Sequence, residues 1–345
     1  MFIVRRWRRE RWVAVSCNYH SQPPGDCRVG TDPLRFDYER TSLGVPDAAW
    51  LDRADIDIFK ESPFVSNPSL PSLAELHEVI RAATRAELLP RFATHDVAGA
   101  DHRGVERMVK GDGSVVTAAD HAMQERLRTE LARRWPQYAL LGEEMSGQTH
   151  ASLMPSAHEG LWCLDPLDGT TNYAAGVPFF GVSLALLKAD GPVLGLIYDP
   201  LRDECFSAAR GQGAWRNGVP LRPTISAPDE LRRCLAVVDF KRLPRPLAAA
   251  LGSAPPYGSQ RNFGACSLEW CWLAAGRFHL YLHGGQKLWD YAAGSLIAAE
   301  AGIPAATLDG ESIFSFGLDS RSVVAAVDVP SFTRWTAWTA SIERR

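Results

Sequence analysis

The sequence LDPLDGTTN at residues 164–172 follows an apolar run and places two carboxylates, Asp165 and Asp168, three residues apart in a turn. Pro166 restricts Asp165 to extended backbone geometry, and Gly169 allows the chain to bend sharply and to approach a ligand closely. Hydroxyls and exposed backbone amides follow at once. Hard cations such as Mg²⁺ prefer oxygen ligands, and phosphate prefers amide donors at a turn or helix start. The stretch therefore favours a divalent cation site beside a phosphate site.

Other acidic positions are needed to interpret this stretch, because Asp, Gly, Thr and Asn are also the usual residues of an ordinary acidic turn. An EF-hand is a further alternative, but its ligands at alternate positions and its closing Glu are absent. Glu143 and Glu144 end another apolar run. Asp120 lies at a predicted helix start, and Asp290 opens an alanine-rich helix. Each of these acids alone is usually structural, as a solvated strand end or a helix cap.

The predicted secondary structure alternates in a way that favours sheets covered by helices. Ser72 and Glu75 fit a capping box, and apolar residues at helical spacing then predict a helix through about Phe92. Further helices are predicted at Thr117–Arg134, Ser267–Ala275 and Asp290–Ala301, and from Ser331 onward. Strands are predicted at Tyr138–Leu141, Leu161–Leu164, Phe179–Leu187, Val193–Tyr198, Cys234–Phe240, Arg277–Leu282 and Ser322–Val327, with an Asn217-Gly218 turn between strands.

The domain organisation follows from the same patterns. Residues 1–70 are predicted to be an irregular N-terminal extension, because prolines and glycines interrupt them and no periodicity is sustained. The Arg-rich start, Met1–Arg11, is interpreted as a solvated tail or the result of an upstream translation start, in preference to an organelle transit peptide. Residues 71–345 are predicted to form one domain, with an N-terminal α+β half at about 71–225 and a C-terminal α/β half at about 226–345.

The composition argues against several classes of protein. The 345 residues are 46% hydrophobic and 22% charged, with a net charge of −3, so nucleic acid is not an expected partner. No apolar stretch approaches the length of a membrane-spanning helix, so no membrane partner is expected. The seven cysteines are scattered and include no Cys-x-x-Cys pair. They favour a reducing compartment, the cytoplasm, over a disulfide framework or a thiolate zinc site.

The order of the motifs resembles the inositol monophosphatase family. The motifs are, along the chain, Lys110 with Val116-Thr117-x-x-Asp120, Gly142-Glu143-Glu144, residues 164–172, residues 173–183, residues 195–218 and Trp289-Asp290-x-Ala-Ala-Gly294. The resemblance covers roughly residues 73–330. Each motif alone is weak evidence, but six motifs in the same order leave little room for chance agreement.

The resemblance implies an α+β fold, a layered α-β-α-β-α sandwich of the inositol monophosphatase/fructose-1,6-bisphosphatase type. It also implies a Li⁺-sensitive phosphatase that uses two or three Mg²⁺ ions, with Mn²⁺ as a substitute, to hydrolyse a small phosphorylated metabolite. Bound metals of this kind neutralise phosphate charge and lower the pKa of a bound water. Because the family is commonly dimeric, a homodimer is expected.

The family's roles map onto matching residues here. The resemblance implies that Glu143, Asp165 and the Leu167 carbonyl hold the first metal. Asp165, Asp168 and Asp290 would hold the second. Asp120 and Thr170, together with the metal ligand Glu143, would serve catalysis by orienting the attacking water. The expected substrate contacts are Gly169, Thr170, Thr171, Lys110 and His283, and Glu144 is expected to join through a water or a third metal.

Two positions depart from the family pattern. Ser114 stands where the family often has Asp, and Asp112 nearby is a candidate replacement. His283 lies seven residues before Asp290, where the inositol-specific enzymes carry a Glu that contacts substrate hydroxyls. His283 is expected either to pair with a second anionic group or to fill the rim. The alternatives are therefore a 3′(2′),5′-bisphosphate nucleotidase or a fructose-1,6-bisphosphatase of the same fold, or a regulatory binding protein that retains the metal site.

Overall fold

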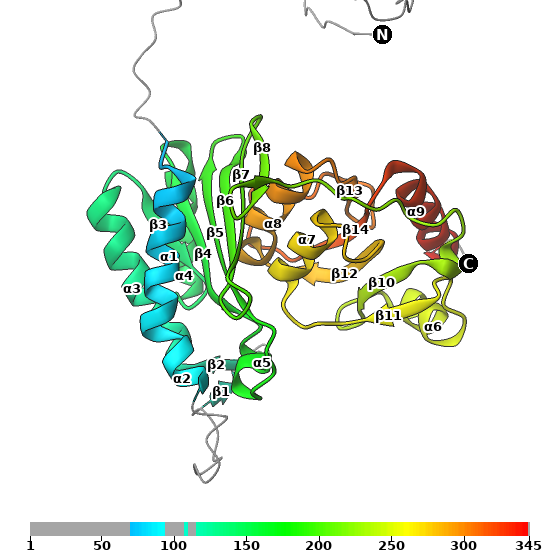
Figure 1. Ribbon diagram of the computed structural model, residues 1–345, viewed down its shortest axis with the longest axis horizontal. Helices are drawn as coiled ribbons and strands as arrows, with labels where there is room; N and C mark the ends of the chain where they lie inside the picture. Colours follow the sequence, from blue (N-terminus) through cyan, green and yellow to red (C-terminus); the bar gives the residue numbers. More distant parts are fainter. Residues whose placement is uncertain (1–69, 94–106, 110–114, 344–345) are drawn as a thin grey trace, which may run out of the picture. The chain divides into compact units, whose positions relative to one another are not determined.

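The computed structural model describes residues 70–93, 107–109 and 115–343 (Figure 1). These residues belong to one compact unit that runs from Ser66 to Arg345. The interpretation of Met1–Arg11 and the expectations for Lys110, Asp112 and Ser114 lie outside the described residues. The division of the chain at residue 70 stays a prediction.

The first layer consists of helices α1 (Leu73–Glu87), α2 (Leu89–Ala93) and α3 (Ala118–Arg134). Ser72 caps α1 as predicted, because its hydroxyl oxygen accepts from the N–H of Glu75. The helix predicted through Phe92 is interrupted at Leu88. Pro90 explains the interruption, since it has no N–H and its ring clashes with the preceding turn of a helix. The apolar faces of α1 and α3 are buried against the next layer.

The second layer is a seven-stranded sheet whose strands follow chain order. Its strands are β3 (Ala139–Gly142), β4 (Leu161–Asp168), β5 (Gly181–Lys188), β6 (Gly191–Asp199), β7 (Glu204–Ala209), β8 (Gly213–Arg216) and β9 (Val219–Pro220). Only β3 and β4 are parallel, and a parallel pair needs a crossover connection. Helix α4 (Gly147–Leu153) and a 3₁₀ turn, Met154–His158, supply it. The sequence pattern predicted neither α4 nor β7, but the Asn217-Gly218 turn joins β8 to β9 as predicted.

The fourth layer is a five-stranded sheet with the order β11-β10-β12-β14-β13. Its strands are β10 (Leu235–Asp239), β11 (Ser259–Arg261), β12 (Leu280–Gln286), β13 (Ala305–Ala306) and β14 (Arg321–Ala326). Helices α6 (Arg245–Ser253) and α9 (Val329–Glu343) pack on its outer face as the fifth layer. Because β10 and β12 are parallel neighbours, their carboxyl ends lie at the same edge of the sheet.

The middle layer holds the two sheets together. It consists of α7 (Cys266–Ala274) and α8 (Leu288–Glu300), which lie between the sheets in Figure 1. A Cβ at Gly195 of β6 would lie 2.9 Å from the carbonyl oxygen of Ala293, so α8 rests directly on the backbone of β6. A Cβ at Gly294 would likewise lie 2.7 Å from Trp270 of α7. The predicted α+β fold with α-β-α-β-α layers is confirmed.

Candidate metal and phosphate site

Strand β4 ends with Asp165 and Asp168, and an irregularity in its pairing turns both carboxylates towards one pocket. On a regular strand, two side chains three residues apart would point to opposite faces of the sheet. Asp165 lies opposite Ser183 of β5 and Asp168 opposite Gly181, so β4 contains one residue more than its partner between these pairs. This bulge resets the alternation, and both carboxylates line the same pocket.

Asp165 meets carboxylates from two other elements. Glu143 directly follows β3, and Asp290 lies in the first turn of α8, where its Oδ2 accepts from the N–H of Lys287. One oxygen from each of Glu143, Asp165 and Asp290 lies within 4.8 Å of the others. Desolvation raises the pKa of Asp165 and of Asp290 well above 3.8, and repulsion from Glu143 and Asp168 raises both further. This crowding of carboxylates favours a cation among them.

Asp168 differs from the other acids because it also caps α7. Its Oδ2 accepts hydrogen bonds from the N–H and the hydroxyl of Ser267, at 2.7 and 2.5 Å. Burial raises the pKa of Asp168 to about 6, although the hydrogen bonds from Ser267 oppose this shift. Asp168 therefore ties β4 of the first sheet to a helix of the middle layer. Its role as a metal ligand stays a prediction.

Asp120 and Thr170 are in direct contact beside these carboxylates. Strand β2 (Val115–Thr117), which pairs with β1 (Arg107–Val109), leads into α3, and Asp120 lies in the first turn of that helix. Asp120 Oδ2 accepts from the N–H and the hydroxyl of Thr117, while Oδ1 accepts from the Thr170 hydroxyl at 2.9 Å. Burial raises the pKa of Asp120. The two residues predicted to orient water therefore form one hydrogen-bonded pair.

The turn after β4 requires glycine at position 169. Gly169 has a left-handed φ of 88°, and a Cβ there would lie within 3.3 Å of three neighbouring atoms. Helix α5 (Thr170–Ala174) begins at once, and the first N–H groups of a helix have no intrahelical acceptor. Residues 169–171 line the pocket. Asn172 donates to the carbonyl of Phe263, which fastens this turn to the C-terminal half.

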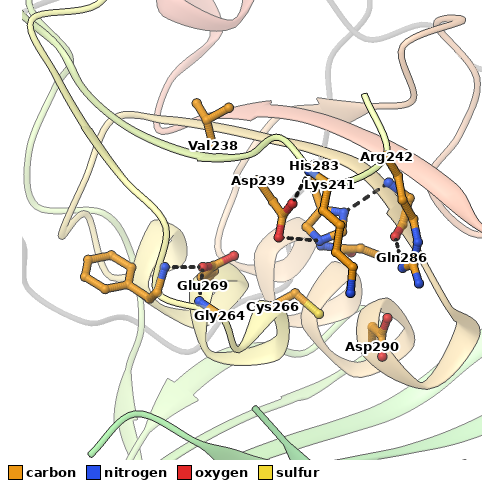
Figure 2. A network of polar contacts seen from close by, with 12 residues as sticks. Val238, Asp239, Lys241, Arg242, Gly264, Cys266, Glu269, His283, Gln286 and Asp290 are labelled. Atoms are coloured by element: carbon orange, nitrogen blue, oxygen red, sulfur yellow. Dashed lines mark hydrogen bonds and ion pairs between the residues drawn. The ribbon is translucent and has the colours of Figure 1, made fainter. Parts of the chain in front are cut away.

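One pocket of about 220 Å³ contains both these acids and a set of basic groups. We call Glu143, Asp165, Asp168 and Asp290 its acidic end. Lys241 and Arg242, which follow β10, form its basic end, and Figure 2 shows them beside Asp239 and His283.

His283 lies at the carboxyl end of β12, on the wall of the basic end. Its Nδ1 accepts from the N–H of Gly285 at 3.1 Å, and its Nε2 faces Asp239 Oδ2 at 3.7 Å. Burial lowers the pKa of His283 to about 4, so its ring is neutral at physiological pH. Both ring nitrogens thus face protein groups. A direct contact of His283 with substrate stays a prediction.

Most residues predicted for the site line this pocket. They are Glu143, Asp165, Leu167, Asp168, Gly169, Thr170, Thr171, His283 and Asp290. Asp120 reaches the pocket through Thr170. Glu144 is not among the described residues that line the pocket; its N–H donates to Gln124 Oε1, and its water-mediated role stays a prediction. The predicted substrate contact of Lys110 lies outside the described residues.

The motifs did not predict several polar residues of the pocket. These are Asp239, Lys241, Arg242, Glu269 and Lys287. Asp239 ends a strand that was predicted, and Lys241 and Arg242 follow it, but only its parallel pairing with β12 brings them to the pocket. Lys287 could have been predicted from the sequence, because it lies only three residues before Asp290.

Glu269 was also missed, because it looks like one polar residue in an apolar helix. It is 1% exposed, and its Oε1 accepts from the N–H groups of Phe263 and Gly264 (Figure 2). Burial, together with the charge of nearby Asp168, raises its pKa to about 8, although the hydrogen bond from Phe263 opposes this shift. Glu269 therefore holds the loop that precedes α7 against the pocket wall.

Comparison with known proteins agrees with this geometry. The sequence pattern of the inositol monophosphatase family matches residues 74–341. Inositol monophosphatase 1 of Solanum lycopersicum is 32% identical over 253 residues, which are 71% of this chain and 88% of the relative. The Nus factor SuhB of Haemophilus influenzae is 30% identical over 227 residues, which are 64% of this chain and 81% of the relative.

A solved structure, the extragenic suppressor protein suhB of Bartonella henselae, shares the fold. Its TM-score is 0.62 at 26% identity, with 78% of this chain and 98% of that chain covered. Fold and pocket together define a phosphoric monoester hydrolase. The chain belongs to the inositol monophosphatase family.

Two further findings concern the surroundings of the protein. Among the described residues, no helix combines the length and the apolar character that a membrane span requires. The cysteines in the described part of the chain, Cys163, Cys205, Cys234, Cys266 and Cys271, are all free thiols.

Proposed function

We propose that the protein hydrolyses a small phosphate monoester, of the inositol or sugar phosphate type, in a Mg²⁺-dependent reaction. The observation that carries this proposal is the meeting of three carboxylates from β3, β4 and α8, with oxygens within 4.8 Å of one another. They lie in the same pocket as the turn at Gly169. A cation cluster and a phosphate-binding turn in one pocket are the two parts that a metal-dependent phosphatase needs.

The residues present fit a hard divalent cation, because the donors at the acidic end are oxygens. In the proposal, Glu143, Asp165 and the Leu167 carbonyl hold one Mg²⁺. Asp165, Asp168 and Asp290 hold a second, and Mn²⁺ can replace either ion. Such ions, when bound, neutralise the phosphate and lower the pKa of a bound water.

The chain's own groups then position the reactants and move a proton. The Thr170 hydroxyl donates to Asp120 Oδ1, so its oxygen can accept a hydrogen bond from the attacking water. The raised pKa of Asp120 suits it to receive a proton through Thr170. The amides of residues 169–171 hold the phosphate oxygens. Positioning and electrostatics supply most of the catalysis in phosphoryl transfer.

Phosphate release from a panel of monoesters tests the proposal. The panel contains inositol 1-phosphate, fructose 1,6-bisphosphate and adenosine 3′,5′-bisphosphate, each with Mg²⁺, with Mg²⁺ and Li⁺, and with EDTA. We expect turnover with Mg²⁺, inhibition by Li⁺ and no turnover with EDTA. No turnover of any compound by the Mg²⁺-loaded protein would refute the proposal.

The names of two relatives favour alternatives within the same fold. A relative from Aquifex aeolicus, 33% identical over 198 residues, is called a fructose-1,6-bisphosphatase/inositol-1-monophosphatase. The panel separates that activity, and a 3′(2′),5′-bisphosphate nucleotidase activity, from inositol phosphate hydrolysis. Relatives called Nus factor SuhB favour a regulatory binding protein that retains the metal site. Metal binding without turnover would favour this last function.

We further propose that the protein acts in the cytoplasm as a homodimer. The free thiols of the described residues support a reducing compartment. Membership of a commonly dimeric family supports the homodimer. Light scattering on the purified full chain tests this state, and a monomer mass at micromolar concentration would exclude it.

A further inference from the structure

The basic end of the pocket is built by a tight turn that follows β10. Asp239 Oδ1 accepts from the N–H of Lys241 at 2.6 Å, and the carbonyl of Phe240 accepts from the N–H of Arg242 at 3.0 Å. Asp side chains commonly stabilise turns in this way. The turn therefore has a defined geometry that presents two consecutive basic side chains, Lys241 and Arg242, to the pocket.

Two consecutive glycines on β12, Gly284 and Gly285, allow this turn to pack closely against the strand. A Cβ at Gly284 would overlap backbone atoms of Arg242 and Leu243, so the two chain segments touch backbone to backbone. Arg242 Nη1 donates to the carbonyl of Gly285 at 2.9 Å. The segment His283-Gly284-Gly285, which contains the departure from the family pattern at His283, is thus in contact with the basic turn. The Arg242–Gly285 hydrogen bond joins residues 43 positions apart.

The Lys241 ammonium has no hydrogen-bond or ion-pair partner among the described residues, and Lys241 and Arg242 are both exposed. Figure 2 shows both side chains extending from the turn towards Cys266 and Asp290. The positive charge of Arg242 also acts on the Asp290 carboxyl, whose raised pKa it lowers slightly. The free donors of the basic end therefore face the interior of the pocket.

The neighbouring groups do not cancel this charge. His283 is neutral at physiological pH, because burial lowers its pKa to about 4. Asp239 supplies one negative charge, but its Oδ1 is used by the turn and its Oδ2 faces His283. Two cations against one engaged carboxylate leave an excess of positive charge. A wall of this kind is poorly suited to accept hydrogen bonds from sugar or inositol hydroxyls, and well suited to an anion.

We propose that Lys241 and Arg242 form a second anion subsite, so that the preferred substrate is a phosphate monoester carrying another phosphate or a carboxylate. This inference rests on the proposed function for the scissile phosphate. A pocket of about 220 Å³ has room for a small metabolite that spans both ends. Asp239 and His283 position the basic turn in this proposal, and they do not touch the substrate.

Matched compounds test the subsite by kcat/KM. The pairs are glycerol 3-phosphate with 3-phosphoglycerate, and fructose 1-phosphate with fructose 1,6-bisphosphate. We expect the partner with the second anionic group to be preferred by about tenfold or more in at least one pair, because a charge-assisted hydrogen bond contributes about 1.5–3 kcal/mol. The first pair reports a carboxylate, and the second reports a phosphate. Equal kcat/KM values within both pairs would overturn the inference.

Variants assign the preference to the turn. In Lys241→Met and in the double variant Lys241→Met/Arg242→Met, the kcat/KM ratio within the preferred pair should fall towards one. Lys241→Met breaks no side-chain hydrogen bond or ion pair of the described residues, so it can be used alone if the double variant folds poorly. Arg245→Met removes the same charge from an exposed residue at the start of α6 that does not line the pocket, and it should keep the preference. A ratio that survives in Lys241→Met and in the folded double variant would overturn the inference.

Binding separates this inference from the proposed function. Calorimetry of the Mg²⁺-loaded protein compares ethylphosphonate with 3-phosphonopropionate and propane-1,3-diphosphonate, none of which can be hydrolysed as an ester. Tighter binding of a compound with a second anionic group, lost in Lys241→Met, supports the subsite even if no ester is turned over. Turnover of monoesters without any such preference supports the proposed function and rejects the subsite.

Discussion

The two ends of the pocket are built in opposite ways. The acidic end draws its carboxylates from β3, β4 and α8, and Asp165 and Asp168 are buried within it. The basic end comes from a single exposed turn after β10. The first is therefore fixed by the packing of the core, and a change there disturbs neighbouring layers. The second can change its residues at little cost to the fold. In our proposal, the acidic end therefore determines the chemistry and the basic end selects the substrate.

Replacing Asp165 by Asn should have the largest effect, because it removes a charge from the centre of the acidic end. We expect phosphate release to fall by more than about 10³-fold, since charge stabilisation by a bound cation contributes several kcal/mol. Mn²⁺ affinity, measured by titration, should fall as well. Asp309→Asn makes the same change at an exposed position and should have little effect. Normal turnover in Asp165→Asn would mean that the acidic end is not the reaction centre.

Asp120→Asn should separate proton acceptance, which we assign to Asp120, from metal binding at the acidic end. Asp120 contacts Thr170 and Thr117 and lies outside the trio of clustered oxygens. We therefore expect kcat to fall by about 10²–10⁴-fold, the usual contribution of a positioned proton acceptor. Metal affinity should change far less. Stopped-flow phosphate release together with Mn²⁺ titration measures both. Full turnover would exclude the proton-accepting role.

Gly284→Ala should disturb the basic end and leave the acidic cluster in place. The new methyl group would overlap the backbone of Arg242 and Leu243, and overlap of this kind costs roughly 1–3 kcal/mol. We expect a lower melting temperature and a reduced preference for substrates with a second anionic group. Gly252→Ala is the matched control, because a Cβ there meets nothing within 4 Å. If Gly284→Ala keeps both the melting temperature and the substrate preference of the wild type, the glycine pair does not hold the turn in place.

Glu269→Gln examines the part of the pocket wall that α7 forms, through the pH dependence of stability. Its folded pKa of about 8 exceeds the ordinary value of 4.5, so the native state binds more protons than the unfolded state between these values. The free energy of unfolding should therefore decrease as pH rises from about 4.5 to about 8. Glutamine keeps an acceptor for Phe263 and Gly264, and it should flatten that decrease.

Urea titrations of the Mg²⁺-saturated protein at pH 5, 7 and 9 would measure the difference between wild type and Glu269→Gln. The exposed Glu159→Gln variant serves as control and should follow the wild type. If the urea midpoints of wild type and Glu269→Gln change in parallel over this pH range, Glu269 is not the buried acid that causes the loss of stability.

The sequence allowed prediction of the acidic end because its residues occur in local motifs. Asp165, Asp168 and Gly169 lie in one stretch, and strand ends and helix starts identified Glu143, Asp120 and Asp290. The basic end was missed because Lys241 and Arg242 reach the pocket only through the parallel pairing of β10 with β12. Short apolar runs do not reveal which strands will pair.

The secondary structure was likewise predicted where the local sequence pattern is clear and missed where it is weak. Helix α1, which has a clear apolar period, and the alanine-rich α8 were predicted, while α4 was not. In α4 only His150 is buried, so its seven residues, Gly147–Leu153, offer little periodicity. The interruption at Leu88 was readable from Pro90, but the long apolar period before it favoured a continuous helix.

The close contact between Gly195 and Ala293 has a consequence for how substrate and product reach and leave the pocket. Asp290 is carried by α8, and Asp165 belongs to the sheet on which α8 rests, so their separation is fixed by touching backbones. This contact opposes a hinge motion that would move Asp290 away from Asp165. In our proposal, substrate and product then enter and leave through an opening whose width depends on the rotamers of side chains at the mouth of the pocket.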